Sequence, residues 1–385
     1  MQKVRVGIIG QGRSGRNMHG AHLLGDARFQ IAAVAETVEA RRIRAAGEYG
    51  CETYADYRDL LARKDLDLVV VATWSHTHPA IVIECLEADH AVLCEKPMAS
   101  TVKDADRMIA AARRTGRLLA VFQQSRFSPS FQRILEVIRS GVLGRVVQIS
   151  MAYNAFSRRW DWQTLQDRWG GNLMNTGPHA LDQALFLFGD GTPDVRCFMD
   201  RANSAGDAED YVKVILSGPG RPVIDVEISS CCAYPAFTYN VQGTRGGLKG
   251  STTQLEWKYL DPAATPPLPP VTDPIAKADG TPAYCSETLA WREDRWAFDP
   301  AASGAVEGTY QNAANDLSAS AGRSRPQASS NYYAAMAAAY YDMLHAALTT
   351  GAPMSVTPAQ VRRQMAVFEI CRAQNPHVYA PPRPG

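Results

Sequence analysis

The chain opens with a short apolar run that leads directly into a glycine-rich turn, and this pairing restricts the fold more than any other feature. Val4–Ile9 is followed by Gly10-Gln11-Gly12-Arg13-Ser14-Gly15. In such a turn the first glycine allows a tight reversal, the second lets a pyrophosphate approach the backbone, and the third lets a helix pack closely. The first helical turn then presents free N–H groups to an anion. We expect a dinucleotide-binding unit, with Arg13 and Ser14 in contact either with phosphate or with solvent.

Alternating strands and helices are predicted as far as residue 123. The expected strands are Val4–Ile9, Gln30–Ala35, Leu66–Ala72, Ala91–Cys94 and Leu118–Phe122, and the expected helices between them include Val38–Tyr49, Pro79–Ala88 and Val102–Thr115. Nearly continuous apolar strands separated by helices are typical of a parallel sheet that is covered on both faces. Residues 1–123 are therefore predicted to form a doubly wound α/β Rossmann domain.

Residues 124–385 show a different order of predicted strands and helices, and they are predicted to form a second, α+β domain. After a helix at Phe131–Ser140, the expected strands are Arg145–Tyr153, Tyr211–Leu216, Val223–Ser229 and Thr238–Gln242. The last three follow one another without helices, which favours a mostly antiparallel open sheet. The proline-rich stretch 261–282 predicts an extended surface excursion, and 332–374 predicts C-terminal helices.

Composition narrows the class of partner. A chain of 385 residues suits two domains that share a cleft, and a formal charge of +1 gives no electrostatic reason to expect nucleic acid or a membrane as partner. The eight cysteines show neither a C-x-x-C pair nor zinc-ligand spacing, so we expect ordinary buried thiols and no metal. Without a signal segment or a run of eighteen apolar residues, we expect a cytoplasmic protein that acts on a small molecule.

Residues at the ends of the predicted strands are candidates for binding a nicotinamide cofactor. Glu36 lies about 20 residues after the glycine turn, where an acid accepts hydrogen bonds from ribose hydroxyls, and this favours NAD over NADP. Arg41 and Arg42 are open to two interpretations, contact with a 2′-phosphate or a solvated helix face. Thr73 and His76 follow a core strand at the edge where open α/β sheets bind ligands. His76 either approaches the cofactor or caps the next helix.

Several further motifs coincide in order along the chain. They are Thr73–His78, Glu95-Lys96-Pro97, Val121–Phe127, Gly170–His179, Val241–Gly247 and Pro353–Thr357. With the glycine turn, they make the chain similar over nearly its whole length to the glucose–fructose oxidoreductase / inositol dehydrogenase / MocA family. The resemblance implies NAD-dependent oxidation or reduction of sugars, cyclitols or their derivatives, and a homo-oligomer, dimer or tetramer, built through the open sheet.

The same resemblance implies roles for individual residues. Lys96 matches the active-site lysine of the family and His179 its acid/base histidine, whereas Glu95, Gln124 and Arg126 match positions close to the cofactor. One position departs from the pattern. The family commonly has aspartate four residues before the histidine, and this chain has Asn175. An amide cannot take up a proton but can still hydrogen-bond a substrate hydroxyl, so proton transfer would fall to Lys96 and His179.

Acid–base chemistry at Lys96 and His179 is also expected from the residues themselves, independently of the resemblance. Loss of hydride from a carbinol carbon requires a base within hydrogen-bond reach of the hydroxyl. A desolvated Lys96 beside a cationic nicotinamide would have a lowered pKa and would stabilise alkoxide charge, and Pro97 restrains its backbone. His179 follows Pro178 at the start of a predicted helix, whose positive end favours a neutral ring. The alternatives are a surface lysine and a histidine that only caps its helix.

Residues that would contact the substrate are less clearly indicated. Asp182, one helical turn beyond His179, orients that histidine, binds a sugar hydroxyl or faces solvent. The segment Arg158-Arg159-Trp160-Asp161-Trp162 offers flat apolar rings for a sugar and guanidinium groups for an anionic substituent. Equally, the arginines would pair with Asp161 or Asp167 and the tryptophans would belong to the core.

Three functions remain open from the sequence. The first is an NAD-dependent oxidoreductase that transfers hydride between nicotinamide and a secondary hydroxyl or carbonyl of a sugar-like substrate, an anionic one included. The second is a redox-neutral, NAD-dependent glycosidase that oxidises a ring hydroxyl transiently, eliminates the aglycone and returns the hydride. The third is a non-catalytic sugar or cofactor sensor.

Overall fold

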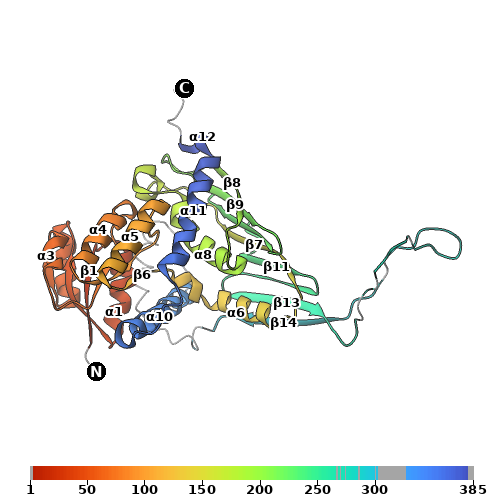
Figure 1. The fold of residues 1–385 in the computed structure, drawn as a ribbon, viewed down its shortest axis with the longest axis horizontal. Helices are drawn as coiled ribbons and strands as arrows, with labels where there is room; N and C mark the ends of the chain where they lie inside the picture. The colour runs from red at the N-terminus through yellow and green to blue at the C-terminus, as the bar shows by residue number, and fades with distance from the viewer. Residues whose placement is uncertain are drawn as a thin grey trace.

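The computed structural model describes residues 3–379, except 266, 267, 269, 274, 285, 286, 300 and 302–326, with the backbone alone for 327–331. These residues form an N-terminal α/β unit and a second unit built on a larger sheet (Figure 1). Cys285 lies outside the described residues, and the other seven cysteines are free thiols. The prediction of buried thiols is confirmed for four of these seven and is wrong for Cys231, which is exposed, and for Cys51 and Cys232, which are half-buried. No helix in the described ranges combines the length and apolarity needed to cross a membrane.

The first sheet has six parallel strands in the order β3-β2-β1-β4-β5-β6. Its strands are β1 (Val4–Ile9), β2 (Phe29–Ala35), β3 (Glu52–Tyr54), β4 (Leu68–Val71), β5 (Ala91–Cys94) and β6 (Leu119–Val121). The helical segments between them are η1 (Gly15–Gly20), α1 (Ala21–Gly25), α2 (Glu39–Tyr49), α3 (Tyr57–Leu61), η2 (Ser75–Thr77), α4 (His78–Glu87) and α5 (Val102–Thr115). The predicted doubly wound α/β fold is confirmed. Because the strand order reverses between β1 and β4, the carboxyl ends of these two strands border a crevice that suits a ligand.

Two local features of this unit were not predicted. The short strand β3 lacks a continuous apolar run, because its three residues are exposed or half-buried at the edge of the sheet. The helix after the glycine turn begins as the π-helical segment η1 and becomes α-helical only at Ala21. The glycine spacing predicted a helix at this place but carried no information about its type.

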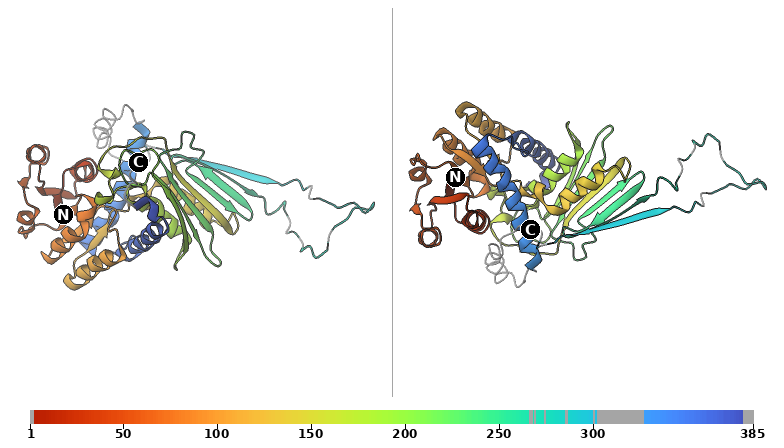
Figure 2. Two further views of the ribbon diagram at one scale, coloured as in Figure 1. Left: turned by 90° about the horizontal axis from the view of Figure 1, so that it is seen from above. Right: turned by 90° about the horizontal axis from the view of Figure 1, so that it is seen from below.

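The second sheet has eight strands in the order β14-β13-β12-β11-β7-β10-β9-β8. They are β7 (Val146–Asn154), β8 (Asp194–Asp200), β9 (Tyr211–Ser217), β10 (Val223–Ser229), β11 (Tyr239–Gly243), β12 (Gly246–Gly250), β13 (Gln254–Leu260) and β14 (Trp291–Ala297). Only β7 and β10 pair in parallel, so the predicted mostly antiparallel sheet is confirmed. Helices cover one face of the sheet and leave the other open (Figure 2).

The helical segments that follow β6 and β7 carry several candidate residues. They are η3 (Gln124–Phe127), α6 (Pro129–Arg139), η4 (Trp162–Thr164), η5 (Gln166–Arg168), α7 (Asn172–Asn175) and α8 (Gly177–Phe188). The C-terminal helices α10 (Gln327–Thr350) and α11 (Pro358–Gln374), followed by the short α12 (Pro376–Tyr379), return towards the first sheet. There α11 packs against α5 and β6, and α10 packs against η3. Both ends of the chain therefore contribute to the junction between the two units.

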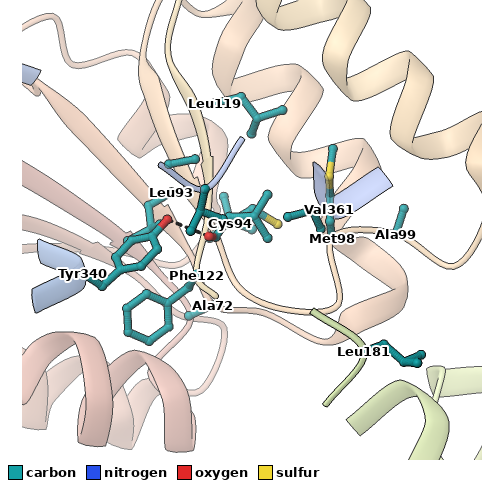
Figure 3. Close-up of a cluster of buried hydrophobic side chains, with 14 of the residues drawn as sticks. Ala72, Leu93, Cys94, Met98, Ala99, Leu119, Phe122, Leu181, Tyr340 and Val361 are labelled. Carbon is teal, nitrogen blue, oxygen red and sulfur yellow. Dashed lines mark hydrogen bonds between the residues drawn. The ribbon is translucent and has the colours of Figure 1, made fainter. Parts of the chain in front are cut away.

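A buried cluster at this junction fixes the end of β5. Leu93 and Cys94 of β5 lie beside Leu119 of β6 and beside Phe122, which directly follows β6 (Figure 3). Tyr340 of α10 completes the cluster. The Tyr340 hydroxyl donates a hydrogen bond of 2.6 Å to a backbone carbonyl of β6, that of Val121. Tight packing of this kind holds the residues that follow β5, Glu95 and Lys96, in a defined place.

The described residues of 261–282 form an extended arm that leaves the second sheet between β13 and β14 (Figures 1 and 2). Apolar side chains on the arm are exposed, among them Leu268, Val271 and Ile275. Prolines suit such a segment because they donate no backbone hydrogen bond to a sheet.

Candidate active site

A cleft of about 1240 Å³ runs along the carboxyl ends of the first sheet and continues against the second sheet. Residues that follow β1, β2, β4 and β5 line it in turn, namely Gly10, Glu36, Thr73 and Lys96. At its far end the lining includes Tyr153 and Tyr239 from β7 and β11, and Tyr332 from α10. A space of this size is larger than a pocket for one drug-sized ligand, whose volume is roughly 300–1,000 Å³.

The glycine turn has the geometry of a phosphate cradle. Gly10 has a φ of +97°, and a Cβ there would lie 2.6 Å from the carbonyl oxygen of Ala72. A Cβ on Gly15 would lie 1.9 Å from the carbonyl oxygen of Gly10, so only glycine allows η1 to pack this closely. Gly12 lines the cleft with nothing within 4 Å of its Cβ position. Arg13 and Ser14 line the cleft next to this space, so the turn fits a pyrophosphate.

Glu36 presents an ionised carboxylate to the cleft at the end of β2. Its oxygens accept hydrogen bonds from the backbone N–H groups of Gln11 at 2.8 Å and Val38 at 3.0 Å. Burial raises the pKa of Glu36, but these hydrogen bonds and the charge of Arg41, 3.5 Å away, bring the pKa below its usual value. Arg42 instead donates to the backbone carbonyls of Glu36 and Thr37. Neither arginine is simply a solvated helix residue.

Lys96 lies at the end of β5 with its amine in the cleft. Nζ donates a 2.9 Å hydrogen bond to the carbonyl oxygen of Asn175, and the peptide bond to Pro97 is cis. Burial, with the charges of Arg13 and Arg159, lowers the pKa of Lys96 to about 8 against the opposing effect of Glu95. An amine with this pKa exchanges protons readily near neutral pH.

His179 lines the same part of the cleft from the first turn of α8. Burial, followed by the charge of Lys96, lowers the pKa of His179 to about 3, so its ring is neutral at physiological pH. A neutral ring agrees with the prediction, but its main cause is burial and not the positive end of the helix. Nδ1 is buried and has no hydrogen-bond partner among the described residues. A buried nitrogen without a partner suits a site that a ligand completes.

Asn175 is held between the two units of the protein. Its Oδ1 accepts a 2.9 Å hydrogen bond from Nε2 of Gln163 and lies 3.5 Å from Nζ of Lys96. Gln163 in turn accepts from Arg159, which forms an ion pair with Asp161. Gln163, Arg159, Trp162 and Asn175 all line the cleft, so part of the predicted substrate segment reaches the site.

The structure places Arg126 and Asp182 away from the cleft, contrary to the expectation of cofactor and substrate contacts. The Arg126 side chain donates to both oxygens of Asp182, at 2.8 and 2.6 Å, and to the carbonyl oxygen of Ser355. Gln364 donates a further hydrogen bond to Asp182. Asp182 therefore neither orients His179 nor faces solvent. This fully buried pair joins η3 to α8 beside α11.

Four other candidates also lie off the cleft. His76 packs against Trp74 and lies 3.3 Å from the Arg168 guanidinium, because η5 covers η2 at this point. Glu95 is buried behind Lys96, where its carboxylate contacts His19 and accepts from the Lys96 backbone N–H. Arg158 and Trp160 are exposed, the latter by 80%, so Trp160 belongs neither to the core nor to the cleft.

Sequence reasoning missed several residues of the cleft, of which Gln163 is the most informative. Tyr153, Tyr239 and Gln183 also line it, and both tyrosine hydroxyls donate to Oε1 of Gln183. Among the predicted residues, Gln124 reaches the cleft with a buried Oε1 that has no partner in the described part of the chain. A single glutamine has no local pattern that indicates a role, because its partners are distant in sequence.

Comparison with known proteins agrees with this arrangement. Residues 4–123 match a family model described as an oxidoreductase family with an NAD-binding Rossmann fold, and residues 131–249 match the GFO/IDH/MocA C-terminal domain. The chain is 32% identical over 247 residues to D-apiose dehydrogenase of Paraburkholderia graminis, covering 60% of this chain and 65% of that protein. It is 28% identical over 258 residues to 2,7-anhydro-N-acetylneuraminate hydratase of Mediterraneibacter gnavus, covering 65% and 67%.

A solved structure shares the fold over nearly the whole chain. The WlbA dehydrogenase from Bordetella pertussis, in complex with NADH and UDP-GlcNAcA, superposes with a TM-score of 0.71 at 20% identity. The match covers 98% of this chain and 96% of that one.

Proposed function

Because the chain belongs to the glucose–fructose oxidoreductase / inositol dehydrogenase / MocA family of oxidoreductases, we propose that it transfers hydride between NAD and a secondary hydroxyl or carbonyl of a sugar, cyclitol or sugar derivative. One observation carries the proposal: Lys96 and His179, both with lowered pKa values, line one cleft together with the glycine turn. Lowered pKa values at a shared cleft are typical of acid–base sites.

Each side chain has a distinct part in this proposal. Gly10, Gly12, Arg13 and Ser14 hold the pyrophosphate, Glu36 binds the adenosine ribose, and the bound nicotinamide supplies a hydride acceptor or donor. Neutral Lys96 takes the proton from the substrate hydroxyl, and its protonated form stabilises alkoxide charge. His179 presents a neutral ring to the same oxygen, and its lowered pKa keeps a second positive charge out of the site.

The direct test is NADH formation with a panel of neutral and acidic sugars and cyclitols, followed by absorbance. Net NADH formation that saturates with one substrate supports the proposal. Saturable sugar binding in a thermal-shift assay, with neither NADH nor product formed, would instead support a sensor.

A redox-neutral reaction is a second candidate. It is supported by the relative named a hydratase, since that name denotes the gain or loss of water rather than net oxidation. Transient oxidation would need the same Lys96 and His179, and Asn175 would be no obstacle. Release of an aglycone from a glycoside without net NADH formation would select the glycosidase form of this reaction.

The pKa of Lys96 predicts a pH dependence. As the general base, Lys96 works in its neutral form, whose fraction rises tenfold per pH unit below a pKa of about 8. We therefore expect kcat/KM for sugar oxidation to rise from pH 6 to pH 8 and to level off above pH 8.5. His179, with a pKa of about 3, adds no inflection in this range. A profile that is flat between pH 6 and 9 would contradict the assignment of Lys96.

Glu36 predicts the preference for NAD over NADP. Its carboxylate binds ribose hydroxyls and repels a 2′-phosphate, so Glu36→Ala is expected to lower the ratio of kcat/KM for NAD to that for NADP by roughly 10–100-fold. Arg42→Ala is the matched control, because Arg42 binds the backbone next to this carboxylate without touching it. An equal change in both variants, or none in Glu36→Ala, would argue against the role of Glu36.

We also propose that the protein is a homo-oligomer, a dimer or tetramer, built through the open face of the second sheet. On β8 the residues facing the helices are buried, whereas Phe198 on the open face is 59% exposed. Val223 of β10, two strands from β8, is exposed on the same face. Apolar groups on a sheet face favour cover by a second copy. The molecular mass from light scattering, for the wild type and for Phe198→Asp, tests this proposal.

A further inference from the structure

Four side chains at the substrate end of the cleft form a chain of hydrogen bonds with a fixed direction. Arg159 donates to Asp161 through Nε and Nη2 at 2.8–2.9 Å, and Nη2 also donates to Oε1 of Gln163. A guanidinium has only donors, so Gln163 must turn its oxygen towards Arg159. Its NH₂ group then faces Asn175, to which it donates at 2.9 Å.

The direction of this chain decides the orientation of the Asn175 amide. Oδ1 of Asn175 faces two donors, Nε2 of Gln163 and, at 3.5 Å, Nζ of Lys96. The NH₂ group is therefore the part of Asn175 that remains for a ligand, and no acceptor binds it among the described residues. The cleft consequently presents a hydrogen-bond donor at a position where an aspartate would present an acceptor.

Positive charge gathers at the same end of the cleft. Lys96 and Arg159 line it, and the charge of Arg159 acts on the Lys96 amine. The carboxylates that line the described cleft, Glu36 and Asp56, follow β2 and β3. At least two strands, β1 and β4, separate these from β5, which precedes Lys96. The substrate end is thus rich in donors and cations and has no facing carboxylate within the described lining.

We propose, resting on the function proposed above, that the substrate is a sugar that carries a carboxylate close to the reacting carbon. Asn175 donates to this carboxylate through Nδ2, and Arg159 donates through Nη1, which none of its hydrogen bonds to Asp161 or Gln163 uses. Gln163 acts as a positioning residue, because it keeps the oxygen of Asn175 turned away from the ligand. A neutral sugar gains less, because its hydroxyl oxygens are weaker acceptors for a guanidinium than a carboxylate is.

The test compares matched pairs of acidic and neutral sugars with the NAD-loaded enzyme. The pairs are D-glucuronate with D-glucose, D-galacturonate with D-galactose and D-mannuronate with D-mannose, measured by NADH formation and by the shift in melting temperature. In the wild type we expect the acid of at least one pair to be preferred in kcat/KM by roughly 10–100-fold, the effect of a hydrogen bond to a charged group.

Two isosteric variants address Asn175 and Gln163 separately. Asn175→Asp replaces the donor by a negative charge, so the ratio of kcat/KM for the acid to that for its neutral partner should fall by roughly 10–100-fold. The new carboxylate also acts on Lys96, 3.5 Å away, but this effect is common to both substrates and cancels in the ratio. Gln163→Glu still accepts from Arg159 but cannot donate to Asn175. The amide of Asn175 should then turn over, and the ratio of kcat/KM for the acid to that for the neutral sugar should fall. If Gln163 had a purely structural role, its replacement would lower kcat/KM for both substrates alike.

The outcomes separate this inference from the proposed function. Preference for neutral sugars, or an unchanged acid-to-neutral ratio in both variants, would overturn the inference and leave the oxidoreductase proposal intact. If no compound of these pairs or of the wider panel of sugars and cyclitols forms NADH or raises the melting temperature, the proposed function fails and this inference fails with it.

Discussion

Replacement of Lys96 by methionine is expected to lower kcat for sugar oxidation by about 10²–10⁴-fold, the usual contribution of a positioned general base. Methionine keeps the length and most of the volume of the side chain but can neither accept the hydroxyl proton nor stabilise alkoxide charge. The dissociation constant of NAD should change little, because the glycine turn and Glu36 lie at other strand ends. Stopped-flow hydride transfer and titration of NAD by fluorescence measure the two quantities.

Lys103→Met is the matched control for this experiment. Lys103 is exposed on α5, outside the cleft, and the same substitution there should leave kcat unchanged. If Lys96→Met keeps a substantial part of the wild-type kcat, another group removes the proton. A second result is equally informative: the rise of kcat/KM with pH should vanish in Lys96→Met, since the group that titrates has been removed.

Replacement of Asp182 by alanine is expected to lower the free energy of unfolding by about 3–5 kcal/mol, because it leaves the buried guanidinium of Arg126 without its counter-charge. The side chains of Arg126 and Asp182 are only 7% and 1% exposed, so water cannot replace the lost carboxylate. The pair also joins three segments that are distant in sequence. A loss of this size is a large part of the total stability of a typical domain. Urea unfolding followed by tryptophan fluorescence measures it.

An exposed ion pair in the same region provides the control. Asp106 of α5 binds Arg362 of α11, and their side chains are 51% and 39% exposed. Asp106→Ala should therefore cost less than about 1 kcal/mol. Equal losses in Asp182→Ala and Asp106→Ala would contradict the view that burial decides the contribution of the Arg126–Asp182 pair. A variant of Asp182 that is stable but no longer binds NAD would indicate that Arg126 belongs to the cofactor site.

Features that depend on neighbouring residues in the chain were accessible from the sequence. The strands Val4–Ile9 and Ala91–Cys94 have the predicted bounds, since a parallel strand buried on both faces requires an apolar side chain at nearly every position. The glycine turn could be predicted because its steric requirements act within six consecutive residues. Strand β3 escaped prediction because an exposed edge strand of three residues has no such pattern.

What the sequence determined by itself was the fold class, the family and the short motifs at strand ends, because sterics and apolar periodicity are encoded locally. Only the tertiary structure decided which polar side chains reach the cleft. Arg126 and Asp182, 56 residues apart, neutralise each other inside the protein, and His76 meets Arg168 from another unit. The amide of Asn175 has its direction set by Gln163 and Lys96, 12 and 79 residues away. A polar side chain binds whichever partner the packing brings near, and its neighbours in the chain do not specify that partner.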